Sequence, residues 1–198
     1  MKYFSETGLE TIARNELKEY DESLILGEPQ AVPIEELVEY HFGLEIEYRH
    51  LRQNGDVLGC TVFNGTKLPI WIPEEKRYAL LEVKGGTIVL DVSLLKCRND
   101  GRLRFTIAHE LAHWLIHQEL YKSGSVAAAH SNCTSMDVDP SVECQANMLG
   151  TCFLMPKNQV KKAFYKVRNS ADSVGELAQI FDVSKQAMGI FLKNHNLM

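Results

Sequence analysis

Apolar residues recur at helical spacing near the start of the chain. Residues 9–17 and 34–42 each place apolar side chains on one face of a helix. Pro33 and Gly43 bound the second of these segments, as expected for the start and the end of a helix. The pattern therefore predicts two helices before the first change of period.

From residue 44 the apolar positions alternate with polar ones, which predicts β-strands. Residues 44–48 alternate with charges in this way, and four further short segments are predicted as strands: 57–63, 68–72, 80–84 and 87–91. The pair Gly85-Gly86 separates the last two and predicts a hairpin between them. Short strands joined by tight turns indicate a small, mainly antiparallel sheet.

Helical spacing returns in the second half of the chain. It predicts a long helix over residues 102–122, a loop over 123–139, and a helix from Pro140 to about Cys152 with Asp139 as its N-cap. Three shorter helices follow, at 157–167, 173–181 and 185–194. The predicted class is α+β: a small, mainly antiparallel sheet packed against helices, with a helical C-terminal segment resembling a helix-turn-helix.

Composition narrows the classes of protein. The chain is 45% hydrophobic and 24% charged, which is ordinary for a soluble globular protein. Its five cysteines are odd in number and contain no Cys-x-x-Cys pair, which argues against a disulfide framework or a cysteine zinc site. The N-terminus has no apolar signal segment, and no stretch is apolar enough to span a membrane. We therefore expect a cytoplasmic protein.

Charge is unevenly distributed. Residues 156–198 carry seven lysines and arginines against three acids, a balance of +4, so the net charge of −5 leaves −9 on residues 1–155. A basic C-terminal segment is compatible with contacts to nucleic acid, although a solvated charged face is the commoner explanation.

The string His109-Glu110-Leu111-Ala112-His113 lies within the long predicted helix and has the pattern of a zinc-binding helix. Residues four apart share one helix face, about 6 Å apart along the axis, so the imidazoles of His109 and His113 can converge on one metal ion. Glu110 projects one residue round from His109, where it could take a proton from the attacking water without ligating the metal. The string predicts a zinc-dependent hydrolase with Glu110 as catalytic base.

A catalytic zinc site needs a third protein ligand. Glu143 is the best candidate because it lies in the first turns of a predicted helix, with Asn147 one turn along the same face and able to orient it. Helix geometry excludes His117, which lies about 12 Å along the axis from His109. Three candidates in the predicted loop, where a rigid ligand is harder to build, stay open: His130, Asp137 and Asp139.

Several runs resemble a known family. Residues 104–108 (RFTIA), which lead into the zinc-binding string, resemble the signature helix of the ImmA/IrrE-type zinc metallo-endopeptidases. The run from Glu143 to Asn147 and the later residues 153–156 (FLMP) resemble the same family, and 177–184 (LAQIFDVS) resemble its C-terminal helical part. The resemblance covers roughly residues 34–198. The chain departs from the family at Ala112, where glycine is usual, and at Gly150 and Cys152, which lie in a stretch that is usually richer in alanine.

The resemblance implies a cytoplasmic endopeptidase with one zinc ion per chain and Glu143 as the third ligand. It implies that the substrate is a helix-turn-helix transcriptional repressor, whose cleavage derepresses genes of a mobile element, a phage or a stress response. We accordingly expect a zincin-like metallopeptidase domain at residues 1–156, with residues 157–198 packed on it as a helical segment.

Two other functions remain in competition. Residues 177–194 have helix-turn-helix proportions, but the second helix carries only Lys185 and Lys193, which is poor equipment for binding DNA. A protein that sequesters a repressor without cutting it is the other alternative, and Glu110 argues against it because a structural zinc site needs no base. His117 and His130 are candidates for a second oxyanion donor.

Overall fold

A computed structural model describes residues 3–54, 56–97, 101–121, 128–131 and 140–198 of the chain. The helices are α1 (Glu6–Tyr20), α2 (Ser23–Leu26), α3 (Ile34–Glu36), the π-helix η1 (Leu37–His41), the 3-10 helix η2 (Val92–Cys97), α4 (Arg102–Ile116), α5 (Gln118–Tyr121), α6 (Pro140–Leu154), α7 (Lys157–Val167), α8 (Ser173–Phe181) and α9 (Lys185–Asn194). The strands are β1 (Glu45–Arg49), β2 (Val57–Val62), β3 (Thr66–Ile72), β4 (Arg77–Val83), β5 (Thr87–Asp91) and β6 (Ala128–Ser131).

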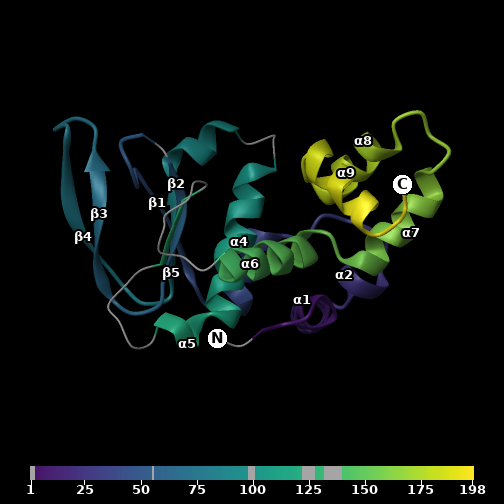
Figure 1. Cartoon of the computed structure of the whole chain (residues 1–198), viewed down its shortest axis with the longest axis horizontal. Coiled ribbons are helices and arrows are strands. Elements are labelled where there is room, and N and C mark those ends of the chain that lie inside the picture. The colour runs from purple at the N-terminus through teal and green to yellow at the C-terminus, as the bar shows by residue number, and fades with distance from the viewer. Residues whose placement is uncertain (1–2, 55, 98–100, 122–127, 132–139) are drawn as a thin grey trace.

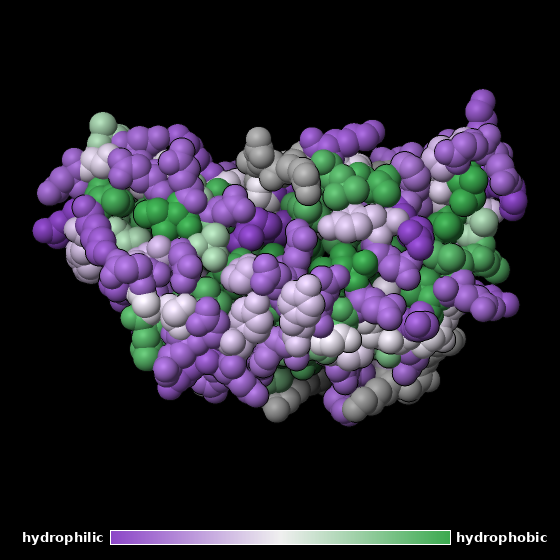
Figure 2. Space-filling model, turned by 180° about the vertical axis from the view of Figure 1, so that it is seen from behind, coloured by the Kyte–Doolittle hydropathy of each residue, from purple (hydrophilic) through white to green (hydrophobic). Residues whose placement is uncertain are grey.

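The strands lie at one end of the molecule, α4 and α6 lie in the middle, and α7, α8 and α9 lie at the other end (Figure 1). The predicted α+β class, with its small and mainly antiparallel sheet, is confirmed. Seen from the opposite side, hydrophobic residues gather in patches over the C-terminal helices and over the β3–β4 hairpin (Figure 2). No helix within the described ranges is long and apolar enough to cross a bilayer.

Four strands form the main sheet in the order β1-β5-β2-β6, and β3 pairs with β4 in a separate two-stranded sheet. β2 pairs antiparallel with both β5 and β6, whereas β1 and β5 are parallel. The predicted hairpin at Gly85-Gly86 is therefore wrong. Gly86, at φ +84°, donates its N–H to the carbonyl of Val62 and accepts from the N–H of Glu45, so the chain leaves β4 and enters the main sheet between β2 and β1.

Strand β6 also differs from the prediction, since Ala128–Ser131 lie within the expected loop. Small and polar residues have weak β-propensity, so the sequence gives little signal for a strand there. The strand forms because β2 offers it a partner. Helix α6 begins at Pro140, while the predicted N-cap Asp139 lies outside the described residues.

The long helix predicted over 102–122 is interrupted. α4 ends at Ile116, and His117 has the non-helical backbone angles φ −117° and ψ 4° before α5 begins at Gln118. The side chain of His117 is buried beneath α4 rather than exposed. Apolar periodicity continues across the interruption, which is why the sequence alone predicts one helix.

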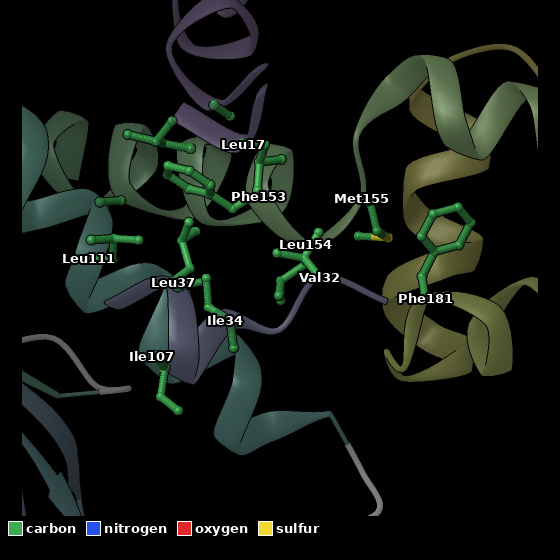
Figure 3. Packing of buried hydrophobic residues seen from close by; sticks show 14 of the residues in the cluster. Leu17, Val32, Ile34, Leu37, Ile107, Leu111, Phe153, Leu154, Met155 and Phe181 are labelled. Atoms are coloured by element: carbon green, nitrogen blue, oxygen red, sulfur yellow. The ribbon is translucent and has the colours of Figure 1, made fainter. Parts of the chain in front are cut away.

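The predicted boundary at residue 156 stays a prediction, but the two sides share one hydrophobic core. Leu111 of α4, Phe153 of α6, Met155 and Phe181 of α8 belong to the same buried cluster (Figure 3). Arg104 strengthens the connection, because its guanidinium donates to the carbonyls of Val32 and Asp182. The C-terminal helices are thus packed against the helices that carry the candidate site.

Candidate metal centre

The site is built where α4 and α6 cross, and a glycine allows the two helices to approach closely. A methyl group at Gly150 of α6 would lie 3.2 Å from the backbone nitrogen of His109 and 3.2 Å from the carbonyl carbon of Ala108. Because no side chain separates the backbones here, the first turns of α6 can bring Glu143 to the histidines of α4. Gly150 is thus part of the crossing.

Three donor groups converge at this crossing. The Nε2 atoms of His109 and His113 are 3.0 Å apart, and oxygens of Glu143 lie 3.3 Å from the first and 3.5 Å from the second. Zinc bonds of about 2.0–2.1 Å in a tetrahedron give edges of about 3.3–3.4 Å between ligand atoms. The two nitrogens and the Glu143 carboxylate, whose Oε2 faces His109 and whose Oε1 faces His113, are therefore close enough to hold one zinc ion together.

The structure describes two other groups of acids and histidine close enough to hold a metal, namely Glu6, Glu10 and His195, and Glu16, Glu19 and His41. Glu10 already accepts a hydrogen bond of 2.7 Å from Lys157. Both groups are more exposed than the crossing, where His109 is 9% and His113 0% exposed. The crossing is the best-enclosed cation site of the three.

Asn147 orients a histidine rather than Glu143, contrary to the sequence-based expectation. Its Oδ1 lies 3.0 Å from Nδ1 of His109. An amide oxygen only accepts, so the ring proton of His109 is held on Nδ1 and Nε2 is left as a lone-pair donor. Such a partner commonly fixes the orientation and the tautomer of a metal-binding histidine.

His117 lies behind His113, as Asn147 lies behind His109. The Nδ1 atoms of the two rings are 3.0 Å apart, on the side of His113 away from its Nε2. When Nε2 of His113 ligates a metal, its proton is on Nδ1 and donates to Nδ1 of His117. This position agrees with the exclusion of His117 as a ligand, because His117 lies on the side of His113 away from Glu143.

Glu110 is held between α4 and β2. The hydroxyl of Thr61 donates to Oε2 of Glu110 at 2.6 Å, and the Glu110 side chain is almost fully buried. A methyl group at Gly59 would lie 2.5 Å from Oε1 of Glu110, so a glycine is needed for the carboxylate to fit. Sequence reasoning missed both residues, although a glycine inside an apolar strand is a known sign of close approach.

Tyr121 of α5 is a third residue near Glu110 and Glu143 that the sequence did not point to. Burial raises the pKa of its phenol, and the nearby carboxylates of Glu143 and Glu110 raise this pKa further. Its ring stacks on Phe63 with centroids 4.9 Å apart. The side chains of the three loop candidates, His130, Asp137 and Asp139, lie outside the described residues.

Comparison with known proteins places this geometry in context. The family described as Peptidase_M78, IrrE N-terminal-like domain, matches residues 89–193, a span that contains all four predicted site residues. A solved structure of a Mycobacterium tuberculosis transcriptional regulator is similar in fold, with a TM-score of 0.54 and 14% sequence identity. The similarity covers 94% of this chain but only 46% of that protein. Comparison with curated protein sequences gives no match.

Proposed function

This chain belongs to the IrrE N-terminal-like peptidase family, and on that premise we propose that it is a zinc-dependent endopeptidase. His109, His113 and Glu143 would hold one zinc ion, and Glu110 would be the catalytic base. The observation that supports this most directly is the convergence of two imidazole nitrogens and a carboxylate to within 3.0–3.5 Å of one another. Two histidines and a carboxylate with an open fourth position are a catalytic donor set.

The bound ion would supply Lewis-acid polarisation of the scissile carbonyl and a more acidic water at neutral pH. The residues of this chain supply the proton transfers. Thr61 donates to Oε2 of Glu110 and fixes the carboxylate, which would take the proton from the attacking water. Glu110 then delivers that proton to the amine of the leaving peptide. Asn147 and His117 hold the two histidine ligands in the required tautomers.

The proposed substrate is a helix-turn-helix transcriptional repressor, whose cleavage would relieve repression. This part rests on the family resemblance, and the fold shared with a protein named as a transcriptional regulator is compatible with it. The competing proposal is a regulator that sequesters the repressor intact. Both proposals require repressor binding, so only the chemistry of Glu110 separates them.

Replacement of Glu110 by glutamine tests the proposal. Glu110→Gln removes the base while preserving the shape and the metal donors, so the variant should keep about one zinc per chain by elemental analysis. Cleavage of the repressor encoded beside this chain should fall by at least 10²–10⁴-fold, the usual value of a positioned base. Glu39→Gln, at an exposed position of η1, is the matched control and should cleave normally.

Two results would count against the proposal. If the wild-type protein contains no zinc, the proposed metal site is wrong. If the wild-type and Glu110→Gln proteins both relieve repression and neither yields fragments, the protein acts by sequestration instead. A time course of fragments beside a binding measurement with intact repressor distinguishes these outcomes.

A further inference from the structure

A groove leads away from the candidate metal centre towards the C-terminal helices. It has a volume of about 1570 Å³ and is lined by residues of α1, α4, α6, α7 and α9, including Phe105, Glu143, Asn147, Met148, Gln186 and Ile190. Small-molecule sites are usually about 300–1,000 Å³. We call it the α6–α9 groove. Glu143 and Asn147 line one part of it, so a chain bound at the metal centre could continue directly into this groove.

Helix α9 presents one particular face to the α6–α9 groove. Gln186, Ile190 and Asn194, each four residues apart, are on the lining side. Ile190 is 53% exposed there, an uncovered aliphatic side chain. Of the described residues, neither lysine of α9 lines the groove, and Lys185 instead pairs with Asp172 at 2.6 Å.

The charge of the lining indicates what kind of polymer fits. Among the described lining residues, three are acids (Glu6, Glu10, Glu143) and three are bases (Arg14, Arg102, Lys157), so their formal charges cancel. Binding to a nucleic-acid backbone depends on an excess of lysine and arginine. The groove has no such excess, whereas side-chain amides, which both donate and accept, match the groups of a peptide backbone.

We propose that the α6–α9 groove binds an extended segment of the protein substrate, and that α9 selects an aliphatic side chain of that segment through Ile190. Helix α9, the second helix of the helix-turn-helix-like pair, would thus contact a protein segment rather than DNA. Only the identification of this segment with the substrate rests on the proposed function, because the groove and its lining are independent of catalysis.

A short-peptide display library, selected against the zinc-loaded full chain carrying Glu110→Gln, tests the proposal without cleavage of the ligands. Enriched peptides should contain an aliphatic residue at a recurring position. Adding Ile190→Glu should weaken their binding at least about tenfold, since a charge replaces an aliphatic contact. Lys193→Gln, which changes the charge by the same amount on the same helix outside the groove, should leave binding unchanged.

Ile190 is largely exposed, so the Ile190→Glu variant should fold, and Gln186→Ala provides a second, milder change in the groove. Absence of enriched peptides, or equal binding by the Ile190→Glu and Lys193→Gln variants, would overturn the proposal. So would binding of a mixed-sequence DNA duplex that is weakened by Ile190→Glu. Failure of the wild-type chain to cut the repressor would overturn the proposed function alone, since peptide binding is measured on a variant without the base.

Discussion

The hydroxyl of Thr61 donates a hydrogen bond of 2.6 Å to the carboxylate of Glu110, so strand β2 directly supports the proposed catalytic base. Successive residues of β2 face opposite ways. Gly59 and Thr61 face α4, whereas Cys60 and Val62 pack into the smaller core with the β3–β4 hairpin. The sheet is therefore both a wall of the candidate site and part of the scaffold behind it.

Removal of that hydroxyl should slow catalysis without loss of metal. A hydrogen bond to a charged group contributes about 1.5–3 kcal/mol, so Thr61→Val should lower kcat by about 10–100-fold. Thr61→Ser keeps the donor and should retain most of the activity. Zinc content and kcat are measured on both variants. Zinc loss in Thr61→Val, or equal activities of the two variants, would show that Thr61 does not act through Glu110.

A side chain at residue 59 should displace the base. The methyl group of Gly59→Ala would lie 2.5 Å from Oε1 of Glu110 and 2.9 Å from Cγ2 of Thr106. We expect a large fall in kcat and a loss of about 1–3 kcal/mol in unfolding free energy from overpacking. Gly189→Ala of α9 is the control, because a methyl group there meets no atom within 4 Å. It should leave kcat unchanged and raise stability by about 0.5–1 kcal/mol. Urea unfolding and steady-state kinetics check both results.

His117 should be required for full zinc affinity although it is not a ligand. Loss of a hydrogen-bond partner behind a metal-binding histidine typically lowers metal affinity by about 10–100-fold. We expect this effect for His117→Leu. His117→Asn places an amide oxygen near the former Nδ1 atom and should restore much of the affinity. Competition with a chelator measures both values. An Asn variant as weak as the Leu variant would indicate that packing, rather than an acceptor for His113, is what His117 provides.

The helix crossing should be sensitive to side-chain size at residue 150. A methyl group would approach backbone atoms of α4 at 3.2–3.3 Å, so Gly150→Ala requires a small shift, while Gly150→Val requires the helices to separate. Zinc affinity and unfolding free energy should fall in the order Gly, Ala, Val, with the Val variant losing about 1–3 kcal/mol. Unchanged zinc affinity in the Val variant would mean that Glu143 reaches the histidines without this close crossing.

The Lys157–Glu10 pair should make stability depend on alkaline pH. The hydrogen bond to Glu10 raises the pKa of the Lys157 ammonium. Since the folded pKa is the higher one, the contribution is complete below the unfolded value of about 10.4 and is lost as pH rises through the folded value. The Lys157→Arg side chain stays charged at alkaline pH. As pH rises through the folded pKa of Lys157, the variant should therefore keep its melting temperature better than the wild type does. Parallel losses in the two proteins would contradict the assignment.

The candidate ligands could be predicted because helix geometry relates His109, Glu110 and His113 locally. Glu143, 30 residues beyond His113, was preferred over the loop candidates because it lies in a predicted helix, and the family resemblance strengthened that choice. The structure brings it to within 3.5 Å of both histidines. Spacing along one helix is a local property that the sequence pattern predicts. The crossing of two helices depends on packing around Gly150, and the spacing of apolar residues does not predict that packing.

Strand partners were the weakest part of the sequence-based prediction. The short apolar run in residues 87–91 correctly predicted a strand, but it cannot say which strands lie beside it. Gly86 bonds to Val62 and Glu45, residues distant in sequence, and this pairing replaced the local hairpin. Thr61 was overlooked for a related reason: its role exists only where β2 meets α4.

The proposed ligands come from two helices, and this arrangement links metal supply to the survival of the protein. An ion held by His109 and His113 on one helix and Glu143 on the other would bind the folded chain and not the unfolded one. At free zinc 100 times the dissociation constant, such binding adds about 2.7 kcal/mol to unfolding free energy. Under zinc starvation the chain would unfold more often and be degraded faster by other proteases. Zinc availability would then set the number of peptidase molecules as well as their activity.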